Sequence, residues 1–165
     1  MGVSNSKSDI RTSNHDSWVT PQDFFDAANK IFDFTLDAAA SAQNAKCAKF
    51  FDETTDGLKQ DWSGHTVWIN PPYKNNAEWV AKIAAEAAKG TTIALLCFAT
   101  TIGTNYVQDN SSDVDYILFV KGRLSFSDGV QNDPAKKPSM LVLFNTKRNH
   151  DVDKLKKLGI LVQKV

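Results

Sequence analysis

Short apolar segments recur along the chain, and the polar stretches between them contain helical patterns. Apolar runs of about four to eight residues bounded by turn residues are typical of strands in a buried sheet. The strands predicted in this way cover residues 34–38, 66–70, 92–98, 116–120 and 139–145. Weaker patterns predict a further strand over 47–51 and an edge strand over 160–165.

Helices are predicted between these strands. Apolar residues recur at helical spacing after Thr20-Pro21, where Thr20 can cap the first turn and proline suits it. A second helix is expected from Asn75 or Asn76, either of which can cap it, to Lys89. Shorter helices are predicted over 41–46, within 99–108 and over 151–158.

This alternation of strands and helices sets the expected fold class. It is typical of an α/β fold with a mainly parallel sheet covered on both faces. At 165 residues, 42% of them hydrophobic, the chain suits one domain with a substantial core. We therefore expect a single domain over residues 16–165, preceded by a flexible polar tail over residues 1–15.

One stretch, Asn70-Pro71-Pro72-Tyr73, ends the strand predicted over 66–70. Consecutive prolines lack N–H donors and restrict φ, so neither a helix nor a central strand continues through them. The result is a stiff turn that holds the Asn70 side chain, nearby carbonyls and the Tyr73 ring in a fixed relation. Because ligands bind at the carboxyl ends of strands in open α/β sheets, this turn is the candidate catalytic site.

The chemistry that suits this turn is methylation of a planar amino group. An exocyclic amine on a heteroaromatic ring is a poor nucleophile, because its lone pair is delocalised into the ring. If Asn70 Oδ1 and the Pro71 carbonyl accept its N–H bonds, they favour a pyramidal nitrogen and stabilise its developing positive charge. Tyr73 can stack on the base, as aromatic side chains do with flipped nucleotides. No general base is needed first, because the nitrogen becomes acidic only after alkylation.

Two aspartates near the predicted strands are further candidates. Asp37 is expected at the carboxyl end of the strand over 34–38, and the small residues that follow, 38–41, let a ligand approach the backbone closely. No GxGxxG sequence accompanies them. Asp61 precedes Trp62, and the pair could hydrogen-bond and stack a heterocycle; a surface aspartate beside a core tryptophan is the alternative.

The formal net charge is zero, which by itself argues against a nucleic-acid-binding protein. The charges are unevenly distributed, however: residues 1–116 carry 9 Lys+Arg and 15 Asp+Glu, whereas residues 117–165 carry 10 and 4. This asymmetry can place one basic face on a neutral protein, and a polyanion binds to such a face whatever the net charge of the whole protein. The alternative is that the basic residues merely solvate a C-terminal helix.

Composition also bears on other classes of protein. No apolar run approaches the roughly 18 residues that span a bilayer, and the polar N-terminus lacks the apolar centre of a signal peptide. We therefore expect a cytoplasmic protein without membrane contacts. Cys47 and Cys97 lie far apart in apolar contexts, so buried free thiols are expected and no metal site.

The Asn-Pro-Pro-Tyr turn resembles the catalytic motif of amino-methyltransferases that use S-adenosylmethionine. The wider pattern, over residues 16–145, is similar to the phage-type DNA N-6-adenine-methyltransferase (Dam) family. The segments that carry this resemblance are Trp18-Val19-Thr20-Pro21, Phe24-Phe25-Asp26, 34–40, Asp56-Gly57-Leu58, Gln60-Asp61-Trp62, 68–73, 122–126 and Pro138-Ser139. Their joint occurrence is far more specific than any one of them.

The resemblance implies a Rossmann-like methyltransferase fold: a doubly wound, mostly parallel sheet with an antiparallel strand near the C-terminus. It also implies S-adenosylmethionine as cofactor. The cofactor-binding residues that it implies are Thr20, Pro21, Asp37, Ala38, Asp52 and Asp61. In this pattern Asp37 contacts the methionine amino group, Asp61 hydrogen-bonds the adenine, and Asp52 is a candidate for the ribose hydroxyls. Many related methyltransferases carry glycines where this chain has alanines after Asp37.

Double-stranded DNA is the expected partner. Lys121, Arg123, Lys136 and Lys137 are candidates for phosphate contacts. Phe126 is either a residue that stacks on or wedges between bases, or a core residue. We expect a monomer or weak dimer encoded by a phage or prophage.

The expected function is site-specific methylation of N6 of an adenine flipped out of DNA. Two alternatives stay open. One is that the substrate is instead an RNA base or a protein glutamine amide, since the same turn serves methyltransferases of both. The other is that the protein is an inactive relative that keeps the fold and DNA binding. The segments 18–21 and 122–126 favour DNA. The intact turn and both carboxylates argue against an inactive relative.

Overall fold

The computed structural model describes residues 19–127, 132–146 and 150–165. The expected tail over residues 1–15 lies outside these residues. The helices of the described chain are α1 (Gln22–Phe32), α2 (Asn76–Ala88), α3 (Asn105–Gln108) and the 3-10 helices η2 (Ala99–Gly103) and η3 (Val152–Leu158). Its strands are β1 (Leu36–Asp37), β2 (Thr66–Ile69), β3 (Thr92–Phe98), β4 (Val114–Val120), β5 (Ser125–Ser127), β6 (Asn132–Pro134), β7 (Ser139–Phe144) and β8 (Gly159–Gln163).

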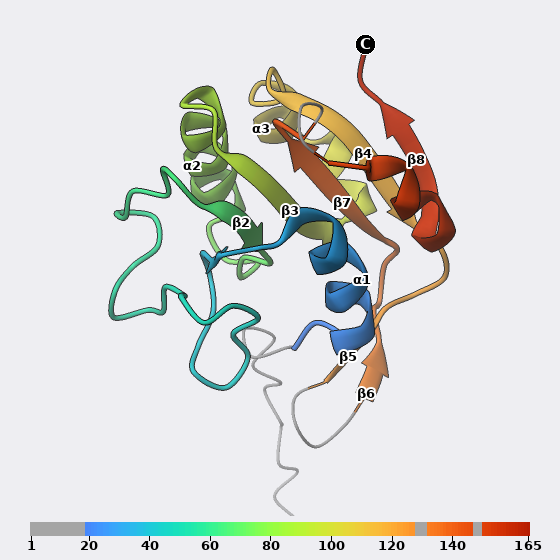
Figure 1. The fold of residues 1–165 in the computed structure, drawn as a ribbon, viewed down its shortest axis with the longest axis horizontal. Helices are drawn as coiled ribbons and strands as arrows, with labels where there is room; N and C mark the ends of the chain where they lie inside the picture. The colour runs from blue at the N-terminus through green and yellow to red at the C-terminus, as the bar shows by residue number, and fades with distance from the viewer. Residues whose placement is uncertain (1–18, 128–131, 147–149) are drawn as a thin grey trace, which may run out of the picture.

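A mixed sheet with the strand order β1-β2-β3-β7-β4-β8 organises the described chain (Figure 1). β1, β2 and β3 are parallel, β7 runs antiparallel between β3 and β4, and β8 pairs antiparallel with β4. The α/β class is confirmed, and the expected antiparallel strand near the C-terminus is present as β7; β8 also runs antiparallel, so the sheet is mixed and only partly parallel. The chain returns from β4 through the β5–β6 hairpin rather than a crossover helix, which lets β7 pair antiparallel. The arrangement is consistent with a methyltransferase fold.

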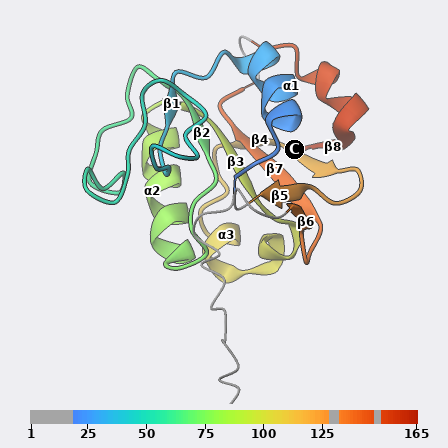
Figure 2. The same ribbon diagram turned by 90° about the horizontal axis from the view of Figure 1, so that it is seen from below.

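Both faces of the sheet are covered, as the alternation of elements predicted. Figure 2 shows α1 on one side of the sheet and α2 and α3 on the other. The side chains of β2 alternate accordingly: Trp68 packs in the core beneath α1 and η3, whereas Val67 and Ile69 pack in the core beneath α2. All three are at most 1% exposed, so β2 is a rigid base for the residues that follow it.

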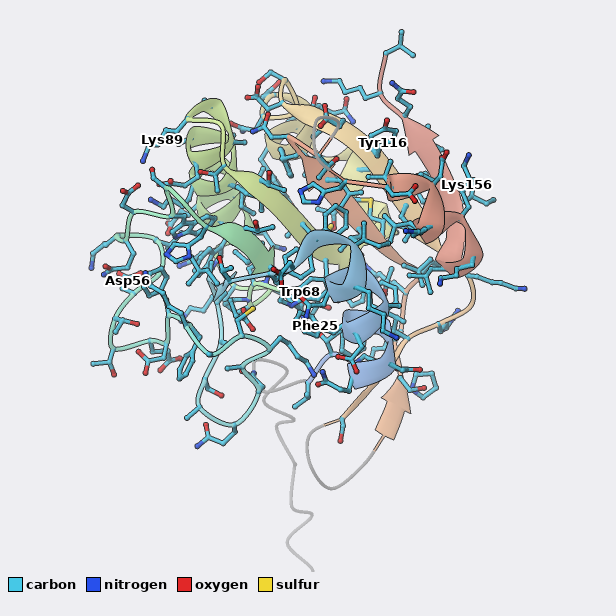
Figure 3. The ribbon with its side chains drawn as sticks, viewed as in Figure 1. Phe25, Asp56, Trp68, Lys89, Tyr116 and Lys156 are labelled. Carbon is cyan, nitrogen blue, oxygen red and sulfur yellow. The ribbon has the colours of Figure 1, made fainter. Side chains whose placement is uncertain are left out.

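α1 is anchored on β2 through its apolar face. The Phe25 ring meets Trp68 edge-on, with ring centroids 5.2 Å apart (Figure 3). The predicted capping by Thr20 is wrong, because Pro21 occupies the N-cap position and its carbonyl accepts the N–H of Phe25 at 3.1 Å. The hydroxyl of Thr20 is thereby available for a contact elsewhere. α2 begins after Asn75, as predicted, although that residue makes no side-chain capping bond.

The segment 39–65 is mostly irregular, and here the predicted elements are shortened or absent. The helix expected over 41–46 is a series of turns, in which Asn44 Oδ1 accepts the N–H of Ser41 at 2.7 Å. Such local bonds compete with a helix that is too short to be stable by itself. The strand expected over 47–51 is reduced to a parallel bridge between Phe50 and Asp37.

Candidate active site

The carboxyl ends of β1, β2 and β3 open onto a pocket of about 1160 Å³. The sequence-predicted residues that line it are Thr20, Asp37, Asp52, Asn70, Pro71, Pro72, Tyr73, Phe126, Lys136 and Lys137. The predicted residues outside the lining are Pro21, Ala38, Asp61, Lys121 and Arg123. The pocket therefore lies at the edge of the sheet where ligands bind in open α/β folds.

The turn after β2 is braced by the end of β3. Pro71 is buried, and the Tyr73 ring, 40% exposed, stacks on Phe98 with centroids 4.6 Å apart and planes 8° apart. Burial raises the pKa of Tyr73 to about 12, so its ring stays a neutral phenol at physiological pH. A fixed, partly exposed aromatic ring is a suitable platform for a planar base. Phe98 is absent from the sequence predictions, although its place at the end of a buried apolar run could have indicated it.

Asn70 is held by a hydrogen bond from a distant segment. Its Nδ2 donates to Thr20 Oγ1 at 3.2 Å. Thr20 is 4% exposed and lies just before α1, so this partner is fixed by the packing of α1 on the sheet. With Nδ2 engaged, Oδ1 is the end of the amide that can accept a hydrogen bond from a ligand in the pocket.

Asp37 ends β1 and is 3% exposed. Its carboxylate accepts the backbone N–H of Lys46 at 3.0 Å and that of Ala39 at 3.5 Å. Burial raises the pKa of Asp37 to about 6, and the two N–H bonds and the Lys46 charge offset only part of this desolvation. A buried carboxylate whose desolvation is only partly compensated is stabilised by a cation, such as the ammonium group of an amino acid.

Lys46 also lines the pocket beside Asp37, and it is a residue that sequence reasoning missed. Its Nζ donates to Gln22 Oε1 at 2.8 Å. Burial lowers the pKa of Lys46, whereas the charges of Asp37 and Asp26 act in the opposite direction. Asp37 and Lys46 together carry the two charges that complement a zwitterionic amino acid. No local motif marks Lys46, because its position depends on how the irregular segment 39–65 folds back onto β1.

The loop between β1 and β2 packs closely against the strand end. A Cβ built on Gly57 would lie 2.1 Å from the carbonyl oxygen of Ala38, which is fully buried. The carbonyl of Gly57 accepts the indole N–H of Trp62 at 3.0 Å. Asp52 lines the pocket, and hydrogen bonds from the backbone N–H and hydroxyl of Thr55, both 2.9 Å, lower its pKa. A glycine at position 57 is thus required by the packing of this loop against the end of β1.

Asp61 lies on the surface, apart from the pocket. Its carboxylate accepts the hydroxyl of Ser63 at 2.8 Å and pairs with Lys89 at 3.2 Å, and these contacts lower the pKa of Asp61 to about 2. Trp62 is fully buried. This is the surface aspartate and core tryptophan of the alternative interpretation, and the structure does not bring Asp61 to the cofactor position that the resemblance implied.

Three of the basic residues after β4 differ in whether they line the pocket. Lys136 and Lys137 are exposed at the pocket, and Lys137 Nζ lies 5.9 Å from the centroid of the Phe98 ring. Arg123 donates to the carbonyls of Ala135 and Lys136 at 3.3 and 3.1 Å, so it braces this segment rather than lining the pocket.

The two remaining candidates for DNA contacts differ in burial. Lys121 is exposed and lies outside the pocket lining. Phe126 is 5% exposed and belongs to the core beneath α1, and it also lines the pocket. The interpretation of Phe126 as a core residue is therefore confirmed.

Three further features of the described residues concern metal sites, membrane spans and thiols. Within them, no group of three or more His, Cys, Asp or Glu residues could hold a metal ion. None of the described helices has the length and apolar character needed to cross a membrane. Cys47 and Cys97 are free, partly buried thiols, and burial raises the pKa of each to about 12.

An α/β sheet that brings an Asn-Pro-Pro-Tyr turn and a buried carboxylate to one pocket defines the class of amino-methyltransferases. Residues 7–159 match the family model described as DNA N-6-adenine-methyltransferase (Dam), and the chain belongs to this family. It is a DNA adenine-N6 methyltransferase related to phage proteins.

Individual relatives agree with the family assignment. The chain is 31% identical over 149 residues to the DNA N-6-adenine-methyltransferase of Haemophilus phage HP1, covering 86% of this chain and 85% of the relative. It is 30% identical over 106 residues to that of Escherichia phage T1, covering 62% of this chain and 44% of the relative. A putative methyltransferase of Escherichia coli K12, YfdM, is 35% identical over 65 residues, which are 35% of this chain and 71% of the relative.

Proposed function

We propose that the protein transfers a methyl group from S-adenosylmethionine to N6 of an adenine that is flipped out of duplex DNA and held at the turn 70–73. The observation that carries this proposal is the convergence of Asn70 and the buried Asp37 on one pocket. Asp37 is the last residue of β1, Asn70 follows the neighbouring parallel strand β2, and both residues line the same pocket. Cofactor and target base then meet at the carboxyl edge of the sheet.

The residues of the pocket fit the cofactor. At about 1160 Å³ the pocket is large enough for a nucleoside-sized cofactor together with a base. The carboxylate of Asp37 complements the ammonium group of the methionine part, and Lys46 complements its carboxylate. Asp52 offers acceptors for ribose hydroxyls. When bound, S-adenosylmethionine supplies an electrophilic methyl group on a sulfonium centre.

The target amine is activated by acceptors at the turn. Asn70 Oδ1 and the Pro71 carbonyl accept the two N–H bonds of the adenine amino group, which makes the nitrogen lone pair available. After alkylation the nitrogen carries a positive charge, and the same acceptors stabilise it until its proton leaves to water. Tyr73, braced by Phe98, supports the plane of the base.

DNA is held by the basic segment beside the pocket. Lys136 and Lys137 are exposed at the pocket, where the backbone next to a flipped nucleotide would pass. Arg123 supports this segment through its hydrogen bonds to two carbonyls. Lys121 extends the basic surface beyond the pocket.

The test of this function is the partition of a labelled methyl group among substrates. Purified protein is incubated with methyl-labelled S-adenosylmethionine and, separately, duplex DNA, RNA or a protein that contains a methylatable glutamine. We expect label in DNA alone. Label in RNA or protein but not in DNA would favour the other substrates of the same turn, and no transfer to any of them would identify an inactive relative.

A further inference from the structure

We propose that Thr20 is a positioning residue that holds the Asn70 amide in its productive orientation. The inference rests on the proposed function, because it concerns how Asn70 presents an acceptor to the target amine. The contact that carries it is the hydrogen bond from Asn70 Nδ2 to Thr20 Oγ1, 3.2 Å long.

The two ends of a carboxamide are chemically opposite, so its orientation decides whether it can act. With Nδ2 on Thr20, Oδ1 faces an N–H of the adenine amino group and accepts it. A half-turn of the amide would place its NH₂ donors against the donors of the target, and no hydrogen bond would form. The Thr20 hydroxyl fixes the plane of the Asn70 amide, and within that plane the target amine is satisfied only when Nδ2 is the end that faces Thr20, as it is here.

Thr20 is itself held by the fold, as a positioning residue must be. The preceding residue, Val19, exchanges backbone hydrogen bonds with Ser127 of β5, at 2.7 and 3.3 Å. Pro21 and α1 follow, and Phe25 of α1 packs on Trp68, which lies two residues before Asn70. Both partners of the Thr20–Asn70 bond are thus fixed relative to the same strand, β2.

This role differs measurably from the cofactor contact that the family resemblance implies for Thr20. A residue that binds the cofactor changes the dissociation constant of S-adenosylmethionine when it is altered. A residue that positions Asn70 instead changes the rate constant of methyl transfer at saturating cofactor and DNA. The two roles are separated by measuring both constants for the same variant.

The matched variants are Thr20→Val, which keeps the shape but removes Oγ1, and Thr20→Ser, which keeps the hydroxyl. Thr20→Val should slow single-turnover methyl transfer by about tenfold to a hundredfold, with cofactor affinity within about threefold of wild type. Thr20→Ser should restore most of the rate. A wild-type rate in Thr20→Val, or a loss confined to cofactor affinity, would overturn the proposal.

A second comparison uses Asn70→Asp. Both oxygens of its carboxylate are acceptors, so a half-turn of the side chain does not change what it presents to the target amine. Adding Thr20→Val to Asn70→Asp should slow transfer by less than about threefold relative to Asn70→Asp alone, because there is no amide left to orient. Equal losses from Thr20→Val in both backgrounds would mean that Thr20 acts on folding or binding rather than on the amide.

A measurement without turnover keeps this inference separate from the proposed function. The side-chain NH₂ resonances of Asn70 are assigned as the pair that is missing from the NMR spectrum of Asn70→Asp. Their hydrogen exchange with solvent should become at least about tenfold faster in Thr20→Val than in wild type, since a hydrogen bond is lost. Unchanged exchange would refute the bond. If the wild-type protein methylates no DNA, the proposed function fails, and this exchange experiment still decides the contact.

Discussion

Asp37 ends β1 and Asp61 lies in the irregular segment between β1 and β2, and the surroundings of their carboxylates differ in almost every physical respect. Asp37 ends β1, is 3% exposed, and has a pKa that burial raises to about 6. Asp61 has a side chain that is 68% exposed, and its bonds to Ser63 and Lys89 lower its pKa to about 2. Lys89 lies at the end of α2 in Figure 3, far from the labelled Trp68 at the centre of the molecule.

The difference shows which kind of aspartate is prepared for a ligand. The surface carboxylate of Asp61 is already satisfied by a hydroxyl and an ammonium group, so a ligand would have to displace them. The carboxylate of Asp37 is desolvated and only partly compensated, so the ammonium group of a bound cofactor would relieve a cost that folding has already incurred. Burial at the end of a strand, and not proximity to a tryptophan, therefore marks the carboxylate that we propose for the cofactor.

Replacing each aspartate by asparagine should separate the two regions most strongly. Asp37→Asn should weaken S-adenosylmethionine binding by about tenfold to a hundredfold, because a charge-assisted hydrogen bond is lost in a buried site. The matched variant Asp61→Asn should bind the cofactor within about twofold of wild type, since exposed ion pairs contribute little. Isothermal titration calorimetry measures both constants. Similar losses in the two variants would mean that Asp61 approaches the cofactor in the bound state.

The packing of Gly57 against Ala38, next to Asp37, predicts a smaller effect, on the stability of the protein. Gly57→Ala should lower the free energy of unfolding by about 1–3 kcal/mol, because the added Cβ overlaps the carbonyl of Ala38 and the backbone must move. Gly103→Ala is the control, since a Cβ there meets no atom within 4 Å. Urea unfolding of the two variants gives the comparison. Equal stability of both would show that the loop is not packed against the end of β1.

The raised pKa of Asp37 also predicts a pH dependence of stability. The pKa rises from 3.8 to about 6 on folding, so the folded state binds this proton more tightly. The stabilisation is complete below about pH 4 and is lost as the pH rises through about 6. The free energy of unfolding of Asp37→Asn minus that of the cofactor-free wild type should therefore increase by roughly 2 kcal/mol over this range. A difference that is constant with pH would contradict the burial of this carboxylate.

The sequence predicted the parts of the molecule whose structure is decided locally. The turn 70–73 follows from two prolines after an apolar run, and the apolar faces of α1 and α2 follow from their spacing. Asp37 was placed correctly because β1, although only two residues long in the structure, ends at that position. The core position of Phe126 was one of two interpretations, because burial depends on what packs above a residue.

The rest of the site depends on contacts between segments that are distant in the chain. Thr20 looked like a helix cap, but its partner is Asn70, fifty positions away. Lys46 reaches the pocket only because 39–65 folds back on β1 by means of isolated turns and a single bridge. Asp61 was misplaced because a tryptophan can turn either inward or toward a ligand, and no local pattern distinguishes the two.

We expect Asn70 to act on the amino group of adenine and not on folding or on the cofactor. The most direct test is single-turnover methylation of duplex DNA by wild type and Asn70→Ala at saturating cofactor, followed by nucleoside analysis by mass spectrometry. Wild type should form N6-methyl-2′-deoxyadenosine. Asn70→Ala should be slower by about a hundredfold or more, with cofactor affinity and stability close to wild type. A rate for Asn70→Ala within about tenfold of wild type, or a methyl group on another base, would contradict the account.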